Sequence, residues 1–142
     1  MIQVKLYDRD LSSPEFVDDL TEKVQGLRFT TKLNGGFYEC GFRLALDLPA
    51  AWTWITKRIF YRLLIIDGPQ TLWEGRLENI ALTEGGVTVK CFGYYANLGD
   101  IPYTTAYNNH ANIVIKAVLT ANCAQISSDQ SNIDATGGPA IT

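Results

Sequence analysis

Two alternating segments joined by a glycine turn constrain the fold of this chain more than any other feature. In residues 27–33, Leu27, Phe29, Thr31 and Leu33 share one face, and residues 38–46 alternate again after Asn34-Gly35-Gly36. A period of two is typical of a half-buried strand. Asn-Gly readily adopts the positive φ angles of tight hairpin turns. The sequence therefore predicts an antiparallel hairpin in this region.

Further strands are expected in four segments with alternating or apolar character: residues 2–7, 60–66, 72–82 and 87–94. The last three are separated by Asp67-Gly68-Pro69 and by Glu84-Gly85-Gly86, which are turn signals. We therefore predict a three-stranded antiparallel meander over residues 60–94. A change of parity near Ile80 and Leu82 indicates a bulge or a switch of exposure in its middle strand.

Helical spacing occurs in three places. Trp52, Ile55 and Ile59 lie at the i, i+3/i+4 spacing of an apolar helix face, which predicts a short helix over residues 50–58. A later helix is expected from Asn109 or His110 through Cys123, with Ile115, Val118 and Leu119 on its buried side. Residues 12–25 leave two interpretations open, a short helix with capping-box spacing or an irregular excursion.

Consecutive hairpins followed by a late helix favour a mainly β fold of the β-rich α+β kind over a doubly wound α/β fold. We expect an antiparallel split β-barrel with one or two short helices. The 142 residues suit one such domain, placed at residues 1–123. Residues 124–142 are rich in Ser, Gly and Asp, which predicts a polar, flexible C-terminal segment that leads into a further domain or becomes ordered on assembly.

The charge, the apolar runs and the cysteine spacing argue against nucleic-acid binding, a membrane span, and a disulfide framework or CxxC metal site. The formal net charge is −3 and no Lys/Arg cluster is present, so the sequence lacks the cationic stripe with which proteins grip nucleic acid. Its apolar runs are too short to span a bilayer, and its N-terminus does not resemble a signal peptide. Cys40, Cys91 and Cys123 are widely spaced, which favours free thiols over a disulfide framework or a CxxC metal site.

The sequence carries no recognisable catalytic centre, cofactor motif or metal motif. Its single histidine, His110, has no partner ligands at metal-site spacing, and Cys123 is 13 positions away on the same predicted helix. Glu74 and Glu78 share a strand face with Arg76, as in a charge-balanced, solvated sheet face. The glycine pairs form hairpin turns rather than phosphate-binding loops. We therefore predict that the chain is not an enzyme and needs no cofactor.

The loop aromatics are the main candidates for contact with a partner. Trp52 and Trp54 are two positions apart, so both cannot face the core from one helix. An exposed tryptophan often anchors an interface, whereas the simpler alternative is a satellite hydrophobic cluster beneath the loop. The candidate assembly residues are these two tryptophans and the hairpin turn: Asn34, Gly35, Gly36, Phe37, Trp52 and Trp54.

Two long stretches, LRFTTKLNGGFYECGFRLAL and AAWTWITKRIFYRLLIIDGPQTLWEGRLENIALTEGGVTVKCFGYYANLGD, carry a resemblance to a known group. With the following ANIVIKAVLTANC, they resemble the N-terminal, tail-tube-like domain of baseplate hub and minor tail proteins of long-tailed bacteriophages. The resemblance covers roughly residues 25–133 and consists of turns, aromatics and apolar alternation. The chain departs from this group in length, because hub proteins are usually several-fold longer.

The resemblance implies a structural role. Such domains assemble with copies of themselves and with other tail and baseplate proteins into a ring at the tail tip. DNA passes through the ring without specific binding, and the domain does not insert into a membrane. The expected location is the virion, after synthesis and assembly in the host cytoplasm. Two competing hypotheses are a carbohydrate-binding module that uses exposed Trp and Tyr, and, more remotely, a small hydrolase that depends on His110.

Overall fold

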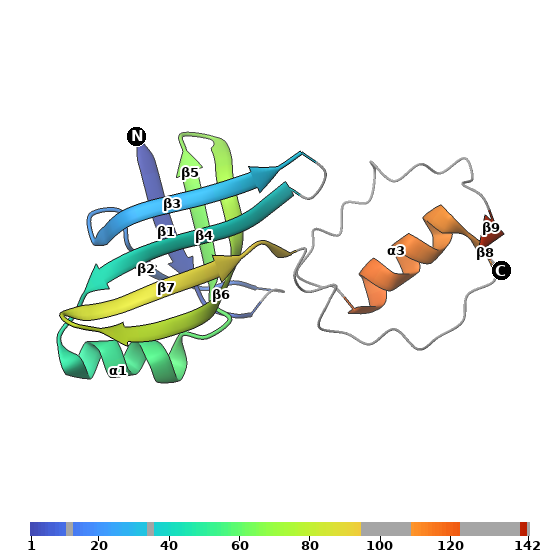
Figure 1. The fold of residues 1–142 in the computed structure, drawn as a ribbon. Coiled ribbons are helices and arrows are strands. Elements are labelled where there is room, and N and C mark those ends of the chain that lie inside the picture. Colours follow the sequence, from blue (N-terminus) through green and yellow to red (C-terminus); the bar gives the residue numbers. More distant parts are fainter. Residues whose placement is uncertain (11–12, 34–35, 95–108, 123–139, 142) are drawn as a thin grey trace. The chain divides into compact units, whose positions relative to one another are not determined.

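The structure is a computed structural model, and it describes residues 1–10, 13–33, 36–94, 109–122 and 140–141 (Figure 1). The chain divides into two compact units, Met1–Ala96 and Asn97–Thr142. The predicted end of the barrel-like domain, at residue 123, lies outside the described residues.

The first unit is built on one sheet of seven strands. They are β1 (Ile2–Tyr7), β2 (Phe16–Asp19), β3 (Val24–Lys32), β4 (Gly36–Ala45), β5 (Arg62–Asp67), β6 (Gln70–Thr83) and β7 (Gly86–Phe92). Their order is β2-β1-β5-β6-β7-β4-β3, and all neighbours are antiparallel. This confirms the predicted mainly β, antiparallel class. The sheet is open, because β2 and β3 each pair with only one neighbour in the described residues.

The hairpin and the meander predicted from the turn signals are both present. In the β3–β4 hairpin, Lys32 lies opposite Gly36 at the turn, and Asn34 and Gly35 lie outside the described residues. β5, β6 and β7 form the antiparallel meander. Its register shifts between Leu77 and Asn79, slightly before the position where the parity change predicted an irregularity.

Alternation along the strands produces one core in the first unit. The fully buried side chains with the largest volumes include Trp73, Leu6, Leu20, Leu63, Ile65 and Leu77. A helix, α1 (Leu48–Lys57), follows β4 and adds Ala51 and Trp54 to this core. Asp47 is its N-cap and accepts a hydrogen bond from the backbone N–H of Ala50 at 2.9 Å.

The buried face of α1 differs from the predicted one. The helix was expected to face the core with Trp52, Ile55 and Ile59, but Trp52 is exposed and Ile59 follows the helix. Ala51 and Trp54 are buried instead, with Ile55 half-buried beside them. These residues also satisfy helical spacing, and the sheet that meets the helix decides which face is covered.

The helix considered for residues 12–25 is wrong. Phe16–Asp19 form β2, which pairs with Lys5–Tyr7 of β1, and the backbone N–H of Leu20 donates to the carbonyl of Val4 at 2.8 Å. The open edge of β1 offers strand hydrogen bonds to this segment, and Leu20 becomes part of the core. Tertiary pairing therefore overrides a weak local capping signal.

The second unit contains β8 (Asn109–His110), α3 (Ala111–Asn122) and β9 (Ala140–Ile141), with β8 and β9 antiparallel. The predicted late helix is thus confirmed, but Ile115 is exposed rather than buried, and Val118 is half-buried. The side chain of Leu119 and residue Cys123 lie outside the described residues. No helix in the described ranges is long and apolar enough to cross a membrane.

Candidate assembly surfaces

The first candidate surface is the end of the β3–β4 hairpin, here called the hairpin tip and defined as Lys32 and Leu33. The Leu33 side chain is fully exposed, and the Lys32 ammonium lies 3.2 Å from the centre of the Tyr38 ring. Single exposed apolar side chains are common on protein surfaces, so Leu33 is a contact candidate because of its place at the end of the hairpin and not because of its exposure alone. Leu33 was not among the predicted contact residues. Its position as the last member of an alternating strand before a turn was the available signal.

The predicted turn residues have different environments. Gly36 is exposed, has a φ of 65°, and begins β4. Phe37 turns inward, with its ring centre 6.4 Å from that of Trp73, and packs against the core. Asn34 and Gly35 lie outside the described residues. Among the described turn residues, Gly36 remains accessible to a partner, whereas Phe37 mainly supports the fold.

The second candidate surface is the outer side of α1, here called the α1 surface and defined as Leu48, Pro49 and Trp52. Leu48 is 67% exposed and Trp52 is 60% exposed, and with Pro49 they line a hollow of about 380 Å³ whose walls are almost wholly apolar. Trp54 is only 8% exposed and belongs to the core. The expectation that the two tryptophans face opposite ways is confirmed, and Trp52 is the one available for contact.

The two surfaces lie at opposite ends of β4. The hairpin tip precedes Gly36, the first residue of the strand, and α1 follows Ala45, its last residue, after a two-residue link (Figure 1). At about 3.3 Å per residue, a strand of this length separates its ends by roughly 30 Å. The two surfaces of one unit therefore cannot meet each other.

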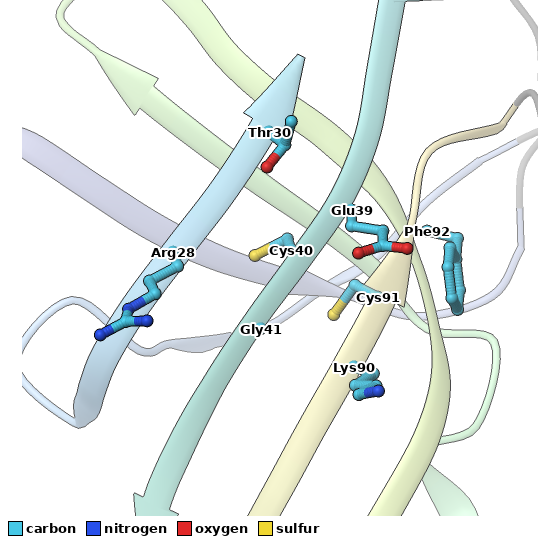
Figure 2. A pocket seen from close by; sticks show the side chains of 8 residues that line it. All are labelled: Arg28, Thr30, Glu39, Cys40, Gly41, Lys90, Cys91 and Phe92. Atoms are coloured by element: carbon cyan, nitrogen blue, oxygen red, sulfur yellow. The ribbon is translucent and has the colours of Figure 1, made fainter. Parts of the chain in front are cut away.

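A smaller pocket of about 160 Å³ lies over β3, β4 and β7 (Figure 2). It is lined by Arg28, Thr30, Glu39, Cys40, Gly41, Lys90, Cys91 and Phe92. Figure 2 shows the Arg28 side chain extending away from Glu39 and Lys90, so the charged groups do not converge on one point. Without convergent polar groups, this pocket lacks the main feature that orients a small ligand.

The two thiols in this region are opposite each other and buried. Cys40 of β4 faces Cys91 of β7 across the strands, and both are free. Burial and the neighbouring Cys40 thiol raise the pKa of Cys91, so its reactive thiolate is disfavoured. Cys123 lies outside the described residues. Nor do the described residues contain a group of three or more side chains suited to hold a metal ion.

The carboxylates of β6 are held in ion pairs. Glu74 lies 2.9 Å from the Arg62 guanidinium, and Glu78 pairs with Arg76. Burial raises the pKa of the Tyr94 phenol, and the neighbouring Glu74 charge raises it further. The phenol is therefore neutral at physiological pH. His110 is exposed at the end of β8, in the second unit. One ion pair joins β5 to β6 and the other lies within β6, so the charges balance as predicted for Glu74 and Glu78, but the four side chains are half-buried rather than solvated.

Comparison with known proteins adds no relative: no protein-family model matches the chain, and no curated protein is similar to it in sequence.

Proposed function

We propose that this chain is a structural component of a bacteriophage tail, a baseplate hub or minor tail protein. In this role it assembles with copies of itself, and with other tail and baseplate proteins, into a ring around the DNA channel at the tail tip. It is made and assembled in the host cytoplasm and ends in the virion. The observation that carries the proposal is the pair of exposed apolar surfaces at opposite ends of β4.

Two different contact surfaces at opposite ends of a subunit are suited to ring assembly. Contacts between two different patches are heterologous, and they close into a ring when the rotation between neighbours allows it. Within the described ranges, β2 and β3 each have one edge without a paired strand, and a ring neighbour would protect these edges from uncontrolled pairing. Together these features favour an oligomer over an isolated monomer.

The charge distribution supports a DNA channel whose wall does not bind DNA tightly. The net charge is −3, and two partly buried arginines, Arg62 and Arg76, are each neutralised by a glutamate. Tight binding to phosphates requires several available cations, because the gain comes from displaced counterions. A surface of this kind lets DNA pass without specific contacts.

Carbohydrate binding is the alternative function, and the residues around Trp52 disfavour it. A sugar stacked on an indole ring also needs nearby hydrogen-bond donors and acceptors for its hydroxyl groups. The hollow beside Trp52 is formed with Leu48 and Pro49 and exposes almost no polar atoms. An apolar protein surface is a better match for this site than a glycan.

The deciding experiment is the mass of the full chain in solution, measured by light scattering over a concentration series. We expect growth toward one discrete oligomer, seen as closed rings by electron microscopy. A strict monomer at the highest concentration would contradict ring formation by this chain alone, and a glycan-array signal lost on Trp52→Ala would then support the carbohydrate-binding alternative.

A further inference from the structure

The hairpin tip and the α1 surface have matching chemistry. The tip presents one fully exposed aliphatic side chain, Leu33, while the α1 surface presents an open apolar hollow of about 380 Å³ lined by Leu48, Pro49 and Trp52. A leucine that enters such a hollow removes apolar area from water on both sides. Neither surface is covered by another described residue of the first unit.

The charges that flank the two surfaces are also complementary. Lys32 immediately precedes Leu33, and Asp47 immediately precedes Leu48. Neither side chain forms an ion pair within the described part of the chain. Opposite charges beside an apolar contact steer association and fix its orientation.

The geometry excludes a contact between the two surfaces of one unit, because β4 holds them at opposite ends. We propose that the hairpin tip of one copy of this chain docks on the α1 surface of the next copy, with Leu33 beside Trp52 and Lys32 facing Asp47. This contact rests on the proposed ring assembly and names the residues that join its subunits. It is heterologous, so every copy offers one tip and one receiving surface.

Two single substitutions in the full chain test this arrangement. Leu33→Ser removes the tip and Trp52→Ser removes the receiving surface, and both side chains are exposed, so the fold is retained. We expect each variant to weaken self-association at least about tenfold, as loss of a central interface residue does. Ile2→Ser, at an exposed apolar side chain on β1 rather than on an edge strand, is the matched control and should associate like the wild type.

Mixing the two variants gives the sharper result. The Trp52→Ser variant still has an intact tip, and the Leu33→Ser variant still has an intact α1 surface. If the contact is heterologous, an equimolar mixture forms a 1:1 dimer that neither variant forms alone, and this dimer stops growing because its free ends are the altered ones. Light scattering or sedimentation velocity measures both species.

A double-mutant cycle tests the charged pair. Lys32→Gln removes one charge, and Asp47→Asn removes the other while keeping an N-cap side chain. If these residues face each other in the assembly, each change weakens association by a similar factor and the double variant is weaker by much less than the product of the two. Fully multiplicative losses would show that Lys32 and Asp47 do not meet.

The outcomes separate this contact from the proposed function. Wild-type rings combined with unchanged rings in both single variants would overturn the contact and leave ring assembly standing. A 1:1 dimer in the mixture, together with open-ended growth of the wild type, would support the contact and contradict the closed ring. A wild type that stays monomeric at all concentrations would overturn both.

Discussion

Gly75 and Gly41 occupy strand interiors, but a side chain at each would meet very different surroundings. A Cβ at Gly75 would overlap the carbonyl oxygen of Phe92 and the ring of Trp73, whereas a Cβ at Gly41 comes no closer than 3.6 Å to the carbonyl oxygen of Val89. We expect Gly75→Ala to lower the free energy of unfolding by about 2 kcal/mol or more, because overpacking forces neighbours to move. Urea unfolding monitored by tryptophan fluorescence measures the loss. Gly41→Ala, the matched control, should change stability by less than about 0.5 kcal/mol.

The two tryptophans of α1 should separate stability from association. Trp54→Ala empties a core position and is expected to cost about 3–5 kcal/mol of unfolding free energy. Trp52→Ala removes an exposed ring, so its effect on stability should stay within about 0.5 kcal/mol. Thermal unfolding of dilute protein, where any oligomer is dissociated, gives the comparison. Equal losses for the two variants would show that Trp52 is covered by its own chain.

Asp19 should titrate below the usual range. The Thr21 hydroxyl donates to its carboxylate, and so does the Thr21 backbone N–H at 2.9 Å, and these bonds lower the pKa of Asp19 from its ordinary value of 3.8. A lowered folded-state pKa means that the carboxylate stabilises the fold above pH 3.8, and that this contribution is lost as the pH falls through the lower folded value. NMR titration of the Asp19 carboxyl measures the shift.

The control for this titration is the hydroxyl itself. Thr21→Val removes the donor and should move the pKa of Asp19 upward, whereas Thr21→Ser keeps the donor and should leave it low. The same hydroxyl accepts a hydrogen bond from the Val4 backbone N–H at 3.0 Å, so Thr21→Val should also loosen the junction between β1 and β2. An unchanged pKa in Thr21→Val would assign the shift to the backbone bond alone.

At the scale of elements, α1 begins because Asp47 caps it. The Asp47 carboxylate accepts from the Ala50 N–H, one of the donors that a helix N-terminus leaves unsatisfied. Asp47→Ala should therefore lower the free energy of unfolding by about 1 kcal/mol, and Asp47→Asn should restore most of it. Hydrogen exchange of the first-turn amides of α1 gives a local measurement. Equal protection in Asp47→Ala and wild type would contradict a capping role.

Elements with strong local signals were predictable from the sequence. The β3–β4 hairpin, the β5–β6–β7 meander, α1 and α3 all have clear periodicity or turn residues. β2 was not predictable, since its strand conformation comes from pairing with β1 rather than from its own residues. The same limit applies to helix faces: periodicity places Trp52 and Trp54 on different sides of α1, but only the packed sheet shows that Trp54 is inside.

At the scale of the whole molecule, the order of the strands is the least predictable feature. β1 pairs with β5 and β4 pairs with β7, and both pairs join segments far apart in the sequence. These pairings hold the hairpin tip and the α1 surface at opposite ends of one rigid strand. The sequence indicated the hairpin turn and the Trp52/Trp54 pair as separate contact candidates. Their relation, and the exposure of Leu33, follow only from the three-dimensional arrangement.

The position of the core predicts which part of the chain folds by itself. All seven strands of the main sheet, α1 and every buried apolar residue from Val4 to Cys91 lie within the first unit, Met1–Ala96. A chain of this size buries enough surface to fold alone. We therefore expect a fragment of residues 1–96 to unfold cooperatively, with a thermal midpoint close to that of the full chain. A fragment of residues 1–123, the domain predicted from the sequence, is the comparison. If it is markedly more stable than 1–96, residues 97–123 contribute to the core, and the predicted boundary at 123 is the better description; equal midpoints would place the end of the folding unit near Ala96.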